Sequence, residues 1–223
     1  MEERTMVAIK DYSIIKLFPK ALFMKRLKQN KKEINHILKV LGKLDTQNAY
    51  QNSAQKETED FTSIVHVSYD KQVLDKLPKL KKRLLNAFYE YKNEVYSYTK
   101  NDFVFTTSWI SKATKGKSSF PHNHRNCMFS GVYYPQMDEK SAAIFFEDTT
   151  DQRFNLSVSQ WNLNNTREVK IDPQSDVVMF FPSELYHIVG THRSEITRYC
   201  IAMNFMPIGE LGDADSYVNL QVK

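Results

Sequence analysis

The sequence contains few of the residues that stabilise small secreted proteins. Its 223 residues include only two cysteines, Cys127 and Cys200, which are too few for a disulfide framework and lack CxxC spacing. A reducing, cytoplasmic setting is therefore expected. No apolar run approaches the roughly 18 residues of a membrane helix, and the acidic start of the chain does not match a secretory signal. These absences predict an ordinary globular protein with no membrane partner.

Negative charge is scarce in the first half of the chain. Residues 1–100 contain 20 Lys or Arg against 12 Asp or Glu, whereas residues 101–223 contain 11 against 14. A basic half can bind nucleic acid or another acidic partner. No aromatic stripe accompanies the lysines, however, as a groove for single strands would require. We expect the lysines to solvate outer helix faces, and nucleic acid is the less favoured partner.

The first hundred residues have the apolar periodicity of two helices. One helix is predicted over 20–43, where Gly42 would end it, and a second over about 74–93, with Pro78 near its start. The shorter segments of this half are two predicted strands, 12–18 and 61–69, and a polar loop, 45–60.

From residue 101 the pattern changes to short strands. Seven runs are rich in β-branched and aromatic residues: FVFTTSWI, MFSGVYY, AAIFFE, REVKI, DVVMFF, HIVGTH and RYCIAMNF. Strands that follow one another without helices indicate an antiparallel sandwich or barrel. We therefore expect a single α+β, mainly β domain over 1–223. It would have a support region over 1–100, a catalytic core over 101–208 and a C-terminal tail over 209–223.

Histidines in the second half point to a metal site. His122 and His124 are one residue apart, so on a strand both imidazoles face the same way. His187, after the turn in FFPSELYH, could supply a third imidazole and leave the opposite positions of the metal open. This set is typical of non-heme iron oxygenases, with a histidine in place of their carboxylate. In an alternative register, His124 is the first ligand and Asn126 a weak substitute for the acid. The other histidines are interpreted as structural: His36, His66 and His192.

Arg198 lies inside RYCIAMNF, which otherwise has the composition of a core strand. A buried guanidinium must be paired, because an uncompensated charge in the interior costs several kcal/mol. The carboxylate of an acidic co-substrate would satisfy it through charge-assisted hydrogen bonds. The alternative is a structural ion pair with an acidic residue of the same half: Glu147, Asp148 or Glu184.

Several further side chains are candidates for the walls of such a site. Tyr133 and Tyr134 face opposite sides of their strand, so one of them points inward, where its hydroxyl would share the ligand carboxylate or cap the core. Asn204 is a candidate for the wall of the co-substrate cavity. Trp109 and Trp161 are expected to be packing residues, and Trp109 could also line the cavity mouth.

The ordered blocks of the second half resemble a known family. HxH–x(5)–SGVYY is followed by IFFED, then FFPSxLxH and finally R–x(5)–NF. This order resembles the 2-oxoglutarate/Fe(II)-dependent oxygenases, and more broadly their prolyl-4-hydroxylase-like group, over about residues 101–207. The resemblance implies a double-stranded β-helix, or jelly roll, with the metal at its open end and N-terminal helices beside it.

Carried over residue by residue, the resemblance implies roles for five side chains. His122 would be the first iron ligand and His187 the distal one. His124 stands where the wider superfamily has Asp or Glu. Arg198 matches the basic residue that pairs with the far carboxylate of 2-oxoglutarate, and Tyr134 matches a tyrosine that often hydrogen-bonds the same group.

An enzyme of this type would use Fe(II), 2-oxoglutarate and O₂ to hydroxylate a substrate, with succinate and CO₂ as co-products. The substrate is unknown, and a protein or peptide is favoured on family analogy alone. Three alternatives remain open. They are a nucleic-acid dealkylating oxygenase that uses the basic half, a cupin-like three-histidine enzyme without 2-oxoglutarate, and a non-catalytic jelly-roll binding module.

Overall fold

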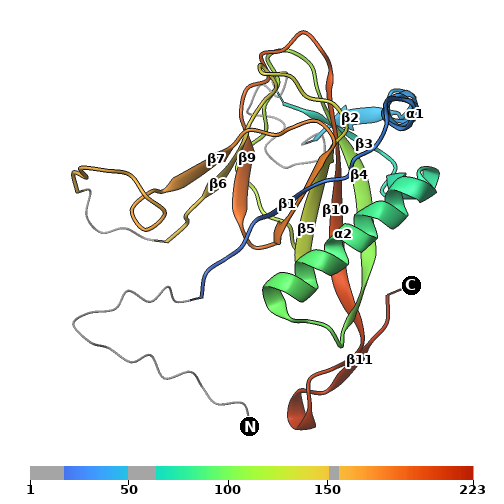
Figure 1. The fold of residues 1–223 in the computed structure, drawn as a ribbon, viewed down its shortest axis with the longest axis vertical. Coiled ribbons are helices and arrows are strands. Elements are labelled where there is room, and N and C mark those ends of the chain that lie inside the picture. The colour runs from blue at the N-terminus through green and yellow to red at the C-terminus, as the bar shows by residue number, and fades with distance from the viewer. Residues whose placement is uncertain (1–17, 50–63, 151–155, 223) are drawn as a thin grey trace.

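The structure, a computed structural model, describes residues 18–49, 64–150 and 156–222, and strands dominate it (Figure 1). The strands are β1 (Phe23–Arg26), β2 (Thr46–Asn48), β3 (His66–Ser68), β4 (Asp102–Ala113), β5 (Phe129–Tyr134), β6 (Ile144–Glu147), β7 (Glu168–Ile171), β8 (Val177–Pro182), β9 (Tyr186–Val189), β10 (Arg198–Leu211) and β11 (Val218–Leu220). A large antiparallel sheet has the order β1–β8–β5–β10–β4–β3–β2, with β11 paired to β10. A small sheet has the order β7–β6–β9.

The seven strands expected after residue 101 are confirmed as β4 to β10. The two central ones are longer than the sequence runs suggest, because β4 and β10 pair with each other along almost their whole length. Strand β10 continues to Leu211 and then turns back as β11, so most of the predicted tail over 209–223 belongs to a hairpin. The mainly β prediction is therefore confirmed.

The first predicted helix is wrong at its start. Helix α1 spans Lys31–Leu41, and the segment before it is strand β1, which pairs with β8. Asn30 caps the helix: its side chain accepts from the Glu33 amide, and the Glu33 side chain accepts from the Asn30 amide. This capping box starts the helix at a fixed residue. Gly42 forms the C-cap, as predicted.

The second predicted helix is confirmed as α2, Pro78–Tyr96, with Pro78 at its first position. Its apolar stripe includes Leu80, Leu84 and Phe88, all buried. Of the other predicted segments, 12–18 falls almost wholly outside the described residues. The loop predicted over 45–60 is wrong in its described part, where strand β2 forms, and β3 lies in the described part of the predicted strand 61–69. No helix in the described ranges is long and apolar enough to cross a membrane.

Helix α2 covers the outer face of the large sheet (Figure 1), and the central strands β5 and β8 are buried on both sides. All six residues of β8 are buried. Val178 and Phe180 pack in the cluster that includes α2, whereas Met179 and Phe181 pack in a second cluster with Ile144 of the small sheet. Alternate residues of one strand thus serve two separate cores.

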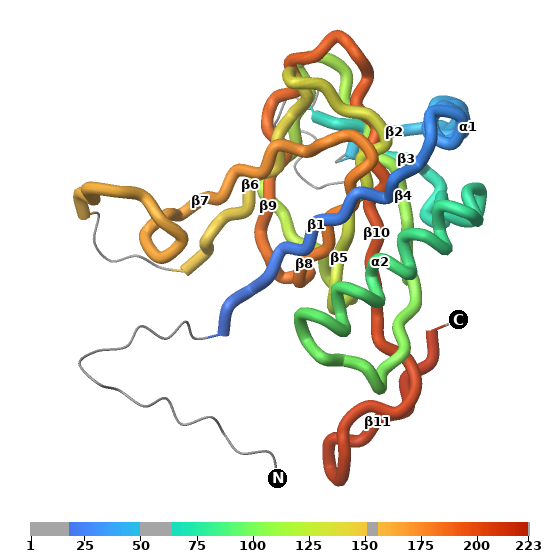
Figure 2. Tube along the Cα trace, in the orientation of Figure 1, coloured from blue at the N-terminus to red at the C-terminus, as the bar shows by residue number. Residues whose placement is uncertain are grey.

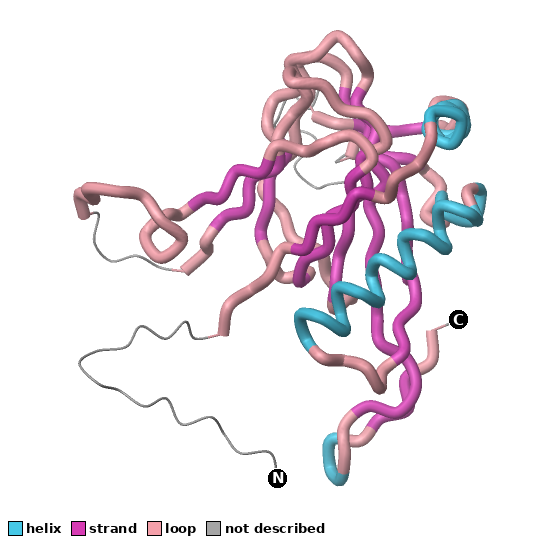
Figure 3. The backbone as a smooth tube through the Cα atoms, in the orientation of Figure 1, coloured by secondary structure: helices cyan, strands magenta, loops and turns pink. Residues whose placement is uncertain are grey.

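Strands β6 and β7 form an arm that projects from the body on the side opposite the two helices (Figures 2 and 3). The chain between these strands exposes three large apolar side chains: Leu156 (75% exposed), Trp161 (69%) and Leu163 (74%). Trp161 is therefore not a packing residue, and the prediction made for it is wrong. A lone aromatic residue in a polar stretch carries no sequence signal that distinguishes a core position from an exposed one.

Replacing Phe88 by alanine should cost roughly 3–5 kcal/mol of unfolding free energy, the usual range for a buried phenylalanine. The Phe88 ring stacks on Phe205 with centroids 3.8 Å apart and joins α2 to the large sheet. Urea unfolding monitored by circular dichroism measures the change. Trp161→Ala is the matched surface control, with an expected change within about 0.5 kcal/mol. Equal effects of the two substitutions would contradict the role given to α2.

Candidate metal centre and its cavity

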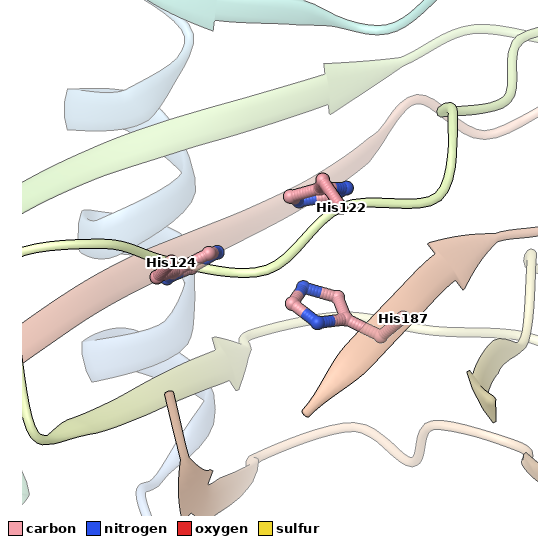
Figure 4. Close-up of side chains that lie close together, drawn as sticks. All are labelled: His122, His124 and His187. Carbon is pink, nitrogen blue, oxygen red and sulfur yellow. The ribbon is translucent and has the colours of Figure 1, made fainter. Parts of the chain in front are cut away.

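The three histidines singled out by the sequence come together at one end of the space between the two sheets (Figure 4). His122 and His124 lie in the irregular segment before β5, and His187 is the second residue of β9. The backbones of His122 and His187 exchange two hydrogen bonds, of 3.0 and 2.8 Å, in an isolated antiparallel bridge. The possible ligand atoms of the three imidazoles lie within 4.8 Å of one another. Asn126, the alternative ligand, is exposed in the turn that follows.

The backbone determines which ring nitrogen of two of these histidines is free. Nδ1 of His122 lies 2.9 Å from the carbonyl oxygen of Phe120, and Nδ1 of His187 lies 3.0 Å from that of Leu185. A carbonyl oxygen can only accept, so each Nδ1 must carry the proton. Each Nε2 therefore keeps a lone pair, which is the form in which a histidine binds a metal.

His124 has a different partner, the side chain of Asn204. Nδ1 of His124 lies 2.7 Å from Oδ1 of Asn204 and 2.9 Å from the hydroxyl oxygen of Ser130. The Trp109 ring packs beside the imidazole, with centroids 5.3 Å apart. Asn204, predicted as a wall of the co-substrate cavity, thus lies directly behind a histidine. Ser130 was not singled out in the sequence at all.

Burial keeps the three imidazoles neutral. Desolvation lowers the pKa of His124 to about 4 and that of His187 to about 3, and it also lowers the pKa of His122. At pH 7 all three are therefore uncharged, and no proton has to leave before a cation binds.

Arg198, at the start of β10, is completely buried. Its Nη1 donates to Sγ of Cys200 at 3.7 Å, but its Nε and Nη2 have no hydrogen-bond partner in the described parts of the chain. The Tyr134 hydroxyl also has none, and the Arg198 guanidinium carbon lies 5.1 Å from the centre of the Tyr134 ring. Burial raises the pKa of Tyr134, so this hydroxyl is a donor. Donors left unpaired in the interior point to an absent acidic ligand.

The structural ion pair proposed as the alternative for Arg198 is not found. Within the described ranges no acidic side chain forms an ion pair with this guanidinium, and Glu184 instead lies 3.3 Å from Lys20. The expectation that one of the two adjacent tyrosines points inward is confirmed. Tyr134 faces the space between the sheets, whereas the Tyr133 hydroxyl donates to Asp176 Oδ1 on the other face.

The histidines and Arg198 share one cavity of about 350 Å³. Strand alternation explains why, because Arg198, Cys200 and Ala202 are every second residue of β10 and face the same side. The remaining wall is mostly apolar and includes Trp109, Val132, Ile144, Phe181 and Val189. In the described residues this cavity has a cationic end, a cluster of neutral metal ligands and no acidic side chain.

Comparison with known proteins finds a similar family for the central part of the chain. Residues 107–204 match the family model described as "Putative 2OG-Fe(II) oxygenase". No curated protein matches the chain. This matched segment extends from β4 to β10 and contains all three histidines and Arg198.

Solved structures share the fold at low sequence identity. An oxidoreductase of the 2OG-Fe(II) oxygenase family from Burkholderia pseudomallei is 11% identical, with a TM-score of 0.57 over 83% of this chain and 84% of its own. HygX from Streptomyces hygroscopicus, with nickel, 2-oxoglutarate and hygromycin B bound, is 12% identical, with a TM-score of 0.55 over 84% and 83%. A Trichoplax adhaerens prolyl hydroxylase bound to a peptide fragment of hypoxia inducible factor is 12% identical, with a TM-score of 0.56 over 83% of each chain. The predicted jelly roll is confirmed.

The metal-free protein should lose stability as the pH falls from about 7 to about 5. The unfolded chain binds protons at histidine near the ordinary pKa of 6.5, whereas folded His187 resists protonation down to about 3. Below about pH 6.5 protons therefore favour the unfolded state, by up to about 1.4 kcal/mol per pH unit for each such histidine. His187→Gln should flatten the pH dependence of urea unfolding. An unchanged dependence in the His187 variant would contradict the neutral buried state.

Proposed function

We propose that this chain is a 2OG-Fe(II) oxygenase, dependent on Fe(II) and 2-oxoglutarate, that hydroxylates a protein or peptide substrate. The match of residues 107–204 to the family model supports this proposal. One observation carries the proposal. Three neutral imidazoles, two of them with Nε2 left free by their backbone contacts, lie in the same cavity as an unpaired, buried guanidinium. The imidazoles can bind a metal, and the guanidinium can bind an anionic co-substrate.

In this proposal His122, His124 and His187 hold the iron. Their chemistry fits: each is uncharged, and the Nδ1 hydrogen bonds of His122 and His187 fix the tautomer and the ring orientation. Imidazole is a suitable ligand for iron. Bound iron would supply the activation of O₂, so that one oxygen atom enters a substrate C–H bond while 2-oxoglutarate becomes succinate and CO₂.

Arg198 binds the remote carboxylate of 2-oxoglutarate, and Tyr134 assists it. The free Nε and Nη2 of the guanidinium and the protonated tyrosine hydroxyl are donors with no partner in the described chain. A carboxylate placed there accepts charge-assisted hydrogen bonds, and its charge compensates a buried cation. This contact sets the distance between the keto end of the co-substrate and the histidines. Val132, Ile144 and Phe181 give this cavity an apolar wall.

A histidine in place of a carboxylate changes the charge of the site. With three neutral ligands, no described protein group offsets the charge of a bound cation, and Arg198 adds a further positive charge. The negative charge of the complex then comes from 2-oxoglutarate. Neutral ligands should also raise the reduction potential of the metal relative to a site with a carboxylate.

A protein or peptide substrate is supported by two observations. One neighbour of similar fold is a prolyl hydroxylase solved with a peptide fragment. In this chain, the arm formed by β6 and β7 exposes Leu156, Trp161 and Leu163, and its strand β6 pairs with β9, where Phe146 lies opposite His187. These three exposed apolar side chains are available for contact with a partner. An extended substrate could thus contact the arm and reach the cavity.

Nucleic acid is disfavoured by where the positive charge lies. The exposed lysines of the two helices, among them Lys32, Lys79 and Lys82, lie on the helical layer, whereas the cavity opens between the sheets. Binding of DNA or RNA with a steep salt dependence would favour the dealkylating alternative. A cupin-like enzyme without 2-oxoglutarate would keep its activity without Arg198, and a non-catalytic module would bind no iron.

His187→Ala should abolish the charge-transfer absorption band that forms when Fe(II) and 2-oxoglutarate are added anaerobically. The loss follows because the cation would keep only two of its three protein ligands. His36→Ala, in which an exposed histidine is removed, should leave the band unchanged. Absence of the band in the unmodified protein would count decisively against the oxygenase proposal.

Arg198→Met should weaken 2-oxoglutarate binding about 10–100-fold, as expected for the loss of hydrogen bonds to a charged group. Isothermal titration of the metal-loaded protein with 2-oxoglutarate measures this change, and Arg193→Met, at an exposed arginine, is the matched control.

Arg198→Met also removes an unpaired buried charge, so it should raise the unfolding free energy of the metal-free protein by at least about 1 kcal/mol. Weaker binding together with lower stability would instead indicate a structural role for Arg198.

A further inference from the structure

Three neighbouring strands place a row of polar side chains behind His124. Asn204 of β10 is the register partner of Ser130 on β5 and of Thr107 on β4. The next row on the same face consists of Val132, Ala202 and Trp109, which line the cavity. A continuous polar row inside a jelly roll is costly unless its members are fully hydrogen-bonded, so its contacts need an explanation.

Along this row each side chain donates a hydrogen bond to the next one. Nδ2 of Asn204 donates to Oγ1 of Thr107 at 3.3 Å, and the Ser130 hydroxyl donates to Oδ1 of Asn204 at 3.0 Å. Ser130 and Ser183 are 2.8 Å apart, and Sγ of Cys127 donates to Ser183 at 3.2 Å. Because Ser130 gives its own proton to Asn204, Ser183 must be the donor in its contact with Ser130. The Thr107 hydroxyl can donate or accept and so fits either orientation of the Asn204 amide, whereas the donor chain from Cys127 through Ser183 and Ser130 ends at Oδ1 and supports the orientation described.

The orientation of this amide determines which nitrogen of His124 is free. With Oδ1 toward the ring, at 2.7 Å, His124 must carry its proton on Nδ1, and Nε2 keeps a lone pair. If the amide were turned over, its NH₂ group would face Nδ1. The histidine would then accept there and hold its proton on Nε2, where no metal could bind. His122 and His187 do not depend on a side-chain partner in this way, because backbone carbonyl oxygens fix their tautomers.

We propose that the row Ser130–Asn204–Thr107 acts as a set of positioning residues that makes His124 a metal ligand. This inference rests on the proposed metal site. The row also accounts for a histidine at this position: a carboxylate has no proton to donate, and it would face the oxygen of Asn204. The row therefore selects imidazole over carboxylate as the ligand on this side of the metal.

The test uses Co²⁺ alone as the metal probe with the full chain. Asn204→Leu removes the acceptor and should raise the Kd for Co²⁺ roughly 10–100-fold, the usual cost of losing the partner of a ligating histidine. Thr107→Val should weaken binding less, because only the anchor of the amide is lost. Asn204→Asp keeps an oxygen toward His124 and should rescue binding to at least the unmodified affinity.

The matched control is Thr106→Val, the same substitution one residue earlier on β4. The Thr106 hydroxyl contacts the backbone carbonyl of Asn204, at 3.4 Å, and not its amide, so the Kd should not change. A second measurement reads the tautomer directly. Nitrogen-15 NMR of histidine-labelled, metal-free protein should show His124 protonated on Nδ1, and this signal should be altered in Asn204→Leu.

The outcomes separate the two proposals. If the unmodified protein does not bind Co²⁺, the proposed metal site is wrong, and the NMR measurement still tests the row. If it binds Co²⁺ and Asn204→Leu changes neither the Kd nor the tautomer, the inference is overturned and the metal site remains. Should Asn204→Leu fail to fold, Thr107→Val and Ser130→Ala decide in the same way, with an unchanged tautomer and Kd in both contradicting the proposal.

Discussion

Burial of the large sheet on both faces is the constraint from which the site follows. Helix α2 covers one face and the small sheet the other, so alternate residues of β5, β8 and β10 enter two different interiors. The interior beside α2 is filled by aromatic and aliphatic side chains. The interior between the sheets also contains the buried side chains of Arg198 and Ser130 and the partly buried Asn204, and polar groups in such places normally have hydrogen-bond partners. Two of these have partners around His124, and Arg198 alone keeps free donors.

The metal end and the cationic end of the cavity are built by different physical means. The imidazoles are held neutral by burial, and their free nitrogens are set by two carbonyl oxygens and one amide oxygen. The guanidinium stays charged in the interior without a counter-ion from the described chain. The proposed oxygenase function needs this combination, because its co-substrate is an anion that must reach a metal at a fixed distance. Geometry is thus supplied by the protein and charge balance by the ligand.

Much of this arrangement could be predicted from the sequence. The strands β4 to β10, the three histidines and the inward tyrosine follow from runs of β-forming residues and from alternation along a strand. Strand β1 was predicted as part of a helix because the order of its apolar and basic residues fits both the helical repeat and the two-residue repeat of a strand. Only the pairing with β8 makes it a strand. Ser130 lies four residues before Tyr134 on the same strand, so alternation could have placed Ser130 on the inner face with Tyr134. Thr107 could not be assigned to the row, because an irregularity in the β4–β10 register lies next to Asn204.

The length of β10 links the two ends of the cavity through a single strand. Arg198 and Asn204 are six positions apart, an even number, and both therefore emerge on the side away from α2. Inserting or deleting one residue between them would turn one of the two toward the helix, where neither guanidinium nor amide could find its partner. Most of the side chains between these two positions are buried, so packing limits their size, and the number of residues between them can change only in pairs.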